Sequence, residues 1–166
     1  VVNNAGIRQR KKFLKITNKE LNEVFKVNFF SIFNIMQIYC SYSIKNKIKS
    51  SIVNIGSIVG ENGFDELVGY SSTKGALKSL TKSFAVEHSK DNIRANIVIP
   101  GFIKTSYYDK FKNNKKKLYK WTKDRTPMSR WGEPQEVVNL IEFLISDDST
   151  YITGSSFNVD GGWLSS

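Results

Sequence analysis

Cysteine is almost absent from this 166-residue chain, which carries Cys40 alone. A single thiol cannot form a disulfide within the chain, so we expect a protein of a reducing compartment, the cytoplasm. Cys40 lies within an apolar helical pattern and has no histidine near it in the sequence. We therefore interpret it as an inert buried thiol rather than a nucleophile, and we expect no metal site.

Long hydrophobic runs are also missing. The longest candidate, residues 29–42, is interrupted by Ser31, Asn34, Gln37 and Ser41, whereas a membrane span needs roughly 18 consecutive apolar residues. Nothing at the N-terminus resembles a signal peptide, so we expect no membrane association. Because the chain opens on Val1, at what reads as the end of a buried strand, we expect it to be the C-terminal part of a longer protein.

Acidic residues are few: 15 Asp and Glu stand against 25 Lys and Arg, for a net charge of +10. The basic residues cluster at 8–12, 45–49 and 112–117, without the interleaved aromatic residues that RNA-binding surfaces use. We interpret them as solvated surface in a lysine-rich chain and expect no nucleic-acid partner. A secondary effect of these charges would be to attract anionic substrates. A hydrophobic content of 40% over this length predicts one domain with a sizeable core.

Strand patterns alternate with helical patterns along the chain. Apolar or β-branched runs at residues 1–6, 51–57, 93–100 and 155–162 predict strands. Helices are predicted from the Thr17 and Glu20 capping box onward, over 28–42 and 70–88, and from Pro134 at a first helical position. This alternation predicts an α/β fold with a Rossmann-like, doubly wound parallel sheet. Ligands bind such sheets at the carboxyl ends of the strands, where Asn4, Ser57, Pro100 and Gly101 fall.

Three polar residues have a suggestive spacing. Tyr70 and Lys74 are one helical turn apart, and Ser57 ends an apolar strand 13 residues upstream of Tyr70. Each has an ordinary explanation by itself: a surface pair on a helix for Tyr70 and Lys74, and a turn residue for Ser57. Joined to "NNAG" at 3–6, Asn28, "PGFIKT" at 100–105 and "NVDGG" at 158–162, they resemble the short-chain dehydrogenase/reductase family of the classical type over essentially the whole chain.

The resemblance implies an enzyme that moves a hydride between nicotinamide and a carbonyl or secondary alcohol, with NAD or NADP as cofactor. It makes Tyr70 the acid/base, Ser57 the group that orients the substrate oxygen, Lys74 the group that lowers the phenol pKa, and Asn28 part of a proton relay. Lowering a tyrosine pKa by about three units needs about 4 kcal/mol of stabilisation of the phenolate. For Asn28 a helix cap is the alternative.

The resemblance also implies a cofactor site, formed by Tyr70 and Lys74 with Asn4, Ala5, Gly6, Pro100, Gly101, Ile103 and Thr105. The family's Gly-rich turn and its residue that selects NAD or NADP are not among residues 1–166. The chain is therefore expected to be the C-terminal two-thirds of one such domain, with a substrate lid at about 104–126. The helices over 29–42 and 70–88 resemble the pair that forms the family's dimer interface, which predicts a homo-oligomer, a dimer or tetramer.

The substrate is suggested by local details. "NNAGIRQRKKF" and "WTKDRTPMSRWGEPQE" most resemble sugar-acid oxidoreductases that act on gluconate or 5-keto-gluconate, and Arg8 or Arg10 could pair with a carboxylate. The tail at 146–162 resembles 3-oxoacyl-[acyl-carrier-protein] reductases equally well, so that activity is the first alternative. A non-catalytic protein that kept the fold is the second.

Overall fold

The structure of the protein is a computed structural model, which describes residues 1–106 and 108–166. Tyr107, which belongs to the predicted lid, lies outside the described residues. The main elements, in chain order, are β1 (Val2–Asn3), α1 (Asn18–Phe25), a π-helical segment (Lys26–Phe30), α2 (Ser31–Asn46), β2 (Ser50–Ile55), α3 (Val68–His88), β3 (Ile93–Pro100), α4 (Tyr108–Asn114), α5 (Lys116–Arg125), α6 (Pro134–Ile145) and β4 (Ser156–Val159). Short 3₁₀ turns occur between several of them.

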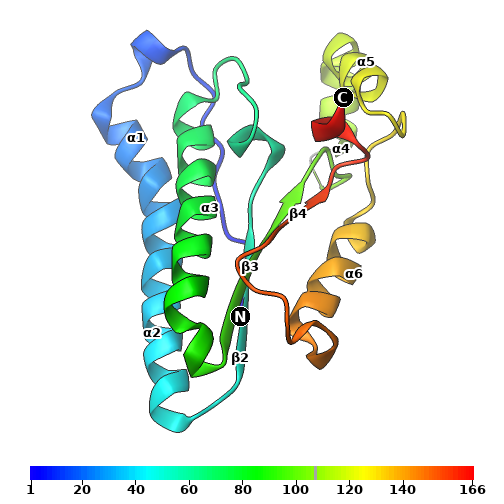
Figure 1. Ribbon diagram of the computed structural model, residues 1–166. Helices are drawn as coiled ribbons and strands as arrows, with labels where there is room; N and C mark the ends of the chain where they lie inside the picture. The colour runs from blue at the N-terminus through cyan, green and yellow to red at the C-terminus, as the bar shows by residue number, and fades with distance from the viewer. Residues whose placement is uncertain (107) are drawn as a thin grey trace.

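A four-stranded parallel sheet forms the centre of the fold, with strand order β1-β2-β3-β4. α2 and α3 cover one face and α6 the other, so the molecule has three layers (Figure 1). On the first face Ile52 and Ile97 pack with Leu77 of α3, and on the second Val53 and Val98 pack with Leu144 of α6. Strands buried on both faces explain the continuous apolar runs. The predicted α/β, Rossmann-like parallel sheet is confirmed.

The helix boundaries follow the expected signals. The capping box is present, because the Glu20 amide donates to Thr17 Oγ1 at 3.3 Å and the Thr17 amide donates to Glu20 Oε2 at 2.9 Å. Pro134 is the first residue of α6, as predicted. α3 begins at Val68, two residues before the predicted start. The helix predicted over 28–42 is part of a longer one, in which the π-helical segment joins α1 to α2.

The predicted lid segment contains α4 and α5, which lie beyond the carboxyl ends of the strands (Figure 1). Trp131 anchors this region: its ring centre lies 5.2 Å from that of Tyr108 and 5.1 Å from that of Phe111. Its indole N–H donates to Thr122 Oγ1 of α5 at 2.8 Å. One buried tryptophan thus holds both helices.

The surface carries apolar side chains on α2. Ile38 is 71% exposed and Tyr42 is 57% exposed, on a helix whose Ile32 and Met36 are buried against the sheet. Cys40, on the same helix, is buried as predicted, and burial raises the pKa of its thiol. Among the residues that the structure describes, no helix is both long enough and apolar enough to cross a membrane.

Candidate active site

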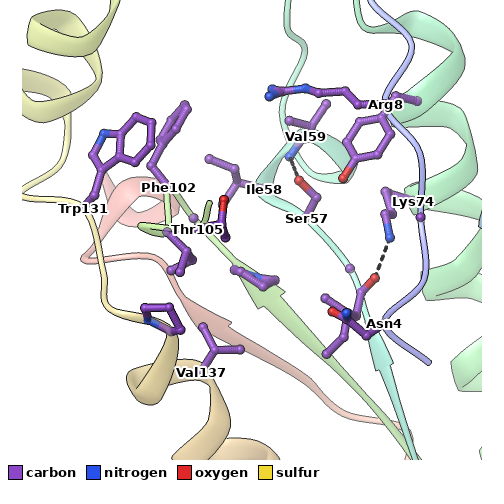
Figure 2. A pocket seen from close by; sticks show the side chains of 18 of the residues that line it. Asn4, Arg8, Ser57, Ile58, Val59, Lys74, Phe102, Thr105, Trp131 and Val137 are labelled. Atoms are coloured by element: carbon purple, nitrogen blue, oxygen red, sulfur yellow. Dashed lines mark hydrogen bonds between the residues drawn. The ribbon is translucent and has the colours of Figure 1, made fainter. Parts of the chain in front are cut away.

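A cavity of 580 Å³ opens at the carboxyl ends of β1, β2 and β3. Figure 2 shows residues from these strand ends and from α3 around it. Nine residues that the sequence predicts for the catalytic or cofactor site line it: Asn4, Gly6, Ser57, Tyr70, Lys74, Pro100, Gly101, Ile103 and Thr105. Ala5 and Asn28, predicted for the same site, are not among the lining residues. The volume suits a small-molecule or cofactor site.

Ser57 directly follows β2 and caps the short turn Ile58–Gly60. Its Oγ accepts a hydrogen bond from the Val59 amide at 3.2 Å, and its side chain lies near enough to Tyr70 to lower the pKa of that phenol. The serine hydroxyl is therefore fixed beside the phenol at the cavity wall. The arrangement can hold one oxygen atom of a ligand between two hydroxyl groups.

The pKa of Tyr70 is raised from its ordinary value. Burial is the main cause, while the Ser57 side chain and the positive charge of Arg8 act in the opposite direction. Lys74 is not among the groups that shift this pKa, and its effect on the phenol stays a prediction. The Lys74 ammonium donates to the carbonyl of Ile55 at 2.7 Å and lies 5.8 Å from the centre of the Tyr70 ring, so it is aimed at the strand rather than at the phenol oxygen.

Lys74 itself is buried, and burial lowers its pKa to about 8. The close approach of α3 to the turn after β2 explains the burial. A Cβ at Gly60 would lie 2.9 Å from Lys74 Cβ, which is closer than real side chains come. Glycine at position 60 lets the turn after β2 pack directly against the Lys74 side chain, so that the lysine lies close to the carboxyl end of β2.

Asn28 is fully buried within the π-helical segment. Its Oδ1 accepts from the Ile7 amide at 2.8 Å, and its Nδ2 donates to the Ile7 carbonyl at 2.9 Å and to Thr73 Oγ1 at 3.2 Å. The helix-cap alternative is wrong, because Asn28 lies inside a continuous helical run. The side chain instead ties the loop after β1 to α3, next to Lys74. Single π-helical turns of this kind often occur at functional sites.

A buried polar network beneath the cavity was not found from the sequence. Asn3 Nδ2 donates to Asn54 Oδ1 at 2.7 Å, and Asn54 Nδ2 donates to Thr81 Oγ1 at 2.9 Å. These contacts link β1, β2 and α3. The sequence feature that could have predicted this network is Asn54, because an amide inside an apolar strand needs hydrogen-bond partners when it is buried.

The sequence left open whether Arg8 or Arg10 could pair with a substrate carboxylate, and the structure distinguishes between them. Arg8 lines the cavity, and its guanidinium carbon lies 6.0 Å from the centre of the Tyr70 ring. Arg10 is not among the lining residues and pairs with Glu66 at 3.6 Å. Phe102, Phe111 and Trp131, which the sequence reasoning did not assign to the site, also line the cavity.

A family model described as enoyl-(acyl carrier protein) reductase matches residues 1–164. The 3-oxoacyl-[acyl-carrier-protein] reductase FabG of Thermotoga maritima is 37% identical over 162 residues, covering 98% of this chain. The 5-keto-D-gluconate 5-reductase of Escherichia coli K12 is 36% identical over 164 residues, covering 99% of this chain. The chain spans 64% of the length of each of these relatives.

Two solved structures have closely similar backbones. A 4-hydroxyisoleucine dehydrogenase complexed with NADH has a TM-score of 0.95 and 38% identity, over 99% of this chain and 68% of that protein. A gluconate 5-dehydrogenase from Burkholderia cenocepacia in complex with NADP and tartrate has a TM-score of 0.93 and 30% identity, over 99% of this chain and 64% of that protein. Both similarities cover the sheet, its helices and the cavity residues.

Proposed function

Because this chain belongs to the short-chain dehydrogenase/reductase family, we propose that the protein carrying it is an NAD(P)-dependent oxidoreductase that interconverts a carbonyl group and a secondary alcohol. One observation supports this most directly: Ser57, Tyr70 and Lys74 line one cavity at the carboxyl end of β2. Two hydroxyl groups and an ammonium at one strand end suit proton transfer to or from a single oxygen atom.

The residues at the cavity fit a nicotinamide cofactor. Asn4, Lys74 and Thr105 offer an amide, an ammonium and a hydroxyl along the strand ends, and Pro100 and Val137 add an apolar surface for a ring. NADH or NADP is present in the two similar structures. When bound, the cofactor would supply or accept the hydride.

The chain's own residues would then handle the proton. In the reducing direction the Tyr70 hydroxyl donates its proton to the carbonyl oxygen, and the Ser57 hydroxyl donates a hydrogen bond to the same oxygen. A phenol whose pKa is raised is protonated at neutral pH, as an acid for this step must be. Asn28 holds the loop after β1 against α3, and we retain the proton relay through Asn28 as part of the proposal.

Two substrate classes are supported by the relatives, and both are anionic. Similarity to the Escherichia coli and Burkholderia cenocepacia proteins supports gluconate or 5-keto-gluconate as the substrate. Similarity to the Thermotoga maritima reductase supports a 3-oxoacyl group on acyl carrier protein as the substrate. The exposed lysines of α4 and α5 would suit an acidic carrier protein. A non-catalytic protein is the third reading, which the gathering of Ser57, Tyr70 and Lys74 at one cavity disfavours.

The test is turnover by the protein that carries this chain. It is mixed with NADH or NADPH and with either 5-keto-D-gluconate or an acetoacetyl thioester, and the loss of reduced nicotinamide is followed by absorbance. Turnover of one substrate identifies the class. Binding of neither cofactor would overturn the proposal.

We also propose that residues 1–166 form the C-terminal two-thirds of one nucleotide-binding domain, because the chain spans 64% of its curated relatives. Titration of residues 1–166 alone with NAD(H) and NADP(H) tests this. Weak binding compared with the protein that carries the chain is expected, and equally tight binding would contradict it.

We also propose that the protein forms a homo-oligomer, a dimer or tetramer. The exposed apolar side chains Phe30, Ile38 and Tyr42 lie on the helical segment that the sequence predicts for a dimer interface. Ile38→Glu would place a charge in that interface and is expected to lower the molar mass measured by light scattering. Lys45→Glu, near the end of the same helix, is the control for a change of charge alone. An unchanged mass in Ile38→Glu would contradict this interface.

A further inference from the structure

The polar side chains of the cavity are few, and nearly all have a task in the proposed function. Among the described lining residues they are Asn4, Arg8, Ser57, Tyr70, Lys74 and Thr105. Asn4, Lys74 and Thr105 fit the cofactor, and Ser57 and Tyr70 fit the reacting oxygen. Arg8 lines the same cavity beside Tyr70, and a guanidinium in this position suits a carboxylate of the substrate.

The cavity wall opposite Arg8 is apolar. Figure 2 shows Arg8 on one side of the cavity and Phe102 and Trp131 on the other, with Ile58 between them. The polar group of Trp131, its indole N–H, is already donated to Thr122. The Val59 amide at this wall is likewise donated to Ser57. The apolar wall, which we define as Ile58, Val59, Phe102, Phe111 and Trp131, thus has no hydrogen-bonding side-chain group to offer a ligand among the described residues.

A polyhydroxylated substrate matches this wall poorly. Hydroxyl groups placed against it would lose their hydrogen bonds to water without gaining partners from the protein, which disfavours binding. An alkyl or aryl group in the same place would instead gain from leaving water. The wall therefore discriminates between two acids of equal length, one hydroxylated and one not.

Resting on the proposed function, we propose that the substrate is an oxo acid with an apolar chain, or the corresponding hydroxy acid. Its carbonyl lies at Ser57 and Tyr70, its carboxylate at Arg8, and its hydrocarbon part on the apolar wall. In reduction the carbonyl carbon accepts the hydride of a reduced nicotinamide and its oxygen accepts the Tyr70 proton, so the C=O bond becomes a C–O single bond. The phenol regains a proton from water, and the nicotinamide is left oxidised.

The decisive experiment compares 5-oxooctanoate with 8-hydroxy-5-oxooctanoate. The two acids have the same spacing between ketone and carboxylate, and they differ by one hydroxyl group on the side of the ketone that points away from Arg8, toward the apolar wall. We expect kcat/KM of the protein that carries this chain to be about tenfold or more higher for 5-oxooctanoate, because an added hydroxyl in an apolar pocket is rejected by factors of this order. An equal or higher value for the hydroxylated acid would overturn the inference while leaving the proposed function standing.

The role of Arg8 is tested with the neutral ketone 2-hexanone. In Arg8→Met the ratio of kcat/KM for 5-oxohexanoate to that for 2-hexanone is expected to fall about tenfold. Arg10→Met removes a neighbouring arginine that pairs with Glu66 outside the cavity, and it is expected to leave the ratio unchanged. A ratio unaffected by Arg8→Met would contradict the carboxylate site.

A binding measurement decides the question independently of turnover. Trp131 lines the cavity, so its fluorescence reports ligands there. Hexanoate is expected to change the fluorescence at a concentration about tenfold below that required for D-gluconate, and Trp131→Phe identifies the signal. If neither cofactor binds but hexanoate binds better than D-gluconate, the proposed function fails and the apolar wall stands. If D-gluconate binds better, the inference fails.

Discussion

Two regions face the same cavity and are held in place by different forces. On the side of β2 and α3, buried polar groups are paired with one another: Asn54 with Thr81, and the Lys74 ammonium with the Ile55 carbonyl. On the side of α4 and α5, aromatic rings pack around Trp131, and the ion pair of Lys120 with Asp124 is exposed. The polar side fixes donors and acceptors at hydrogen-bond distances, which proton transfer requires. The aromatic side offers shape and an apolar surface, which selection of a substrate requires.

The largest effect is expected on the polar side. Tyr70→Phe removes the proposed proton donor while keeping the ring, and kcat of the protein that carries this chain should fall about 10³-fold. Tyr42→Phe removes a hydroxyl that is exposed on α2 and should leave kcat unchanged. A Tyr70→Phe variant that keeps a large part of its activity would show that the phenol is not the acid.

Trp131→Ala tests how far the aromatic side depends on one ring. Replacing a buried tryptophan by alanine costs about 3 to 5 kcal/mol of unfolding free energy, measurable by denaturant titration. Hydrogen exchange should become faster in α4 and α5 but not in α3, because the two sides are held independently. Trp121→Ala, where the side chain is 45% exposed, should cost much less. Equal acceleration in α3 would contradict the separation of the two regions.

Asn54→Ala breaks the network on the polar side. Asn3 and Thr81 each lose a hydrogen-bond partner in the core, and leaving such groups unpaired costs about 1 to 3 kcal/mol. The free energy of unfolding should fall by this amount. Asn113→Ala, at an exposed position of α4, serves as the control and should change stability by less than about 0.5 kcal/mol. Equal losses in the two variants would show that the network contributes nothing.

The smallest effect concerns the charge of Lys74. Its pKa is about 8 in the folded protein and has an ordinary value of 10.5. Between these values the unfolded chain holds a proton that the folded chain has released, so unfolding free energy rises with pH in this window. Relative to Lys74→Met, the wild-type slope should be steeper by at most about 1.4 kcal/mol per pH unit. Lys82→Met, an exposed position on the same helix, should keep the wild-type slope, and a wild-type slope equal to that of Lys74→Met would refute the lowered pKa.

Much of the fold was readable from local pattern. The strand predicted over 93–100 has those bounds in β3, and the Thr17 and Glu20 capping box begins α1 as expected. The gathering of Asn4, Ser57 and Gly101 at one cavity was also predictable, since the carboxyl ends of parallel strands lie at the same edge of a sheet. The aromatic anchor at Trp131 was not, because residues 102, 111 and 131 are brought together only by the packing of α4 against the chain before α6.

By itself, the sequence determined the order of strands and helices, the edge of the sheet where ligands bind and the residues that gather there, because hydrophobic periodicity and turn signals are local properties. Only the tertiary structure decided that Arg8 rather than Arg10 faces the cavity and that the Asn28 side chain holds Ile7. Those outcomes depend on burial and on the direction of single side chains, which are set by contacts between segments far apart in the chain.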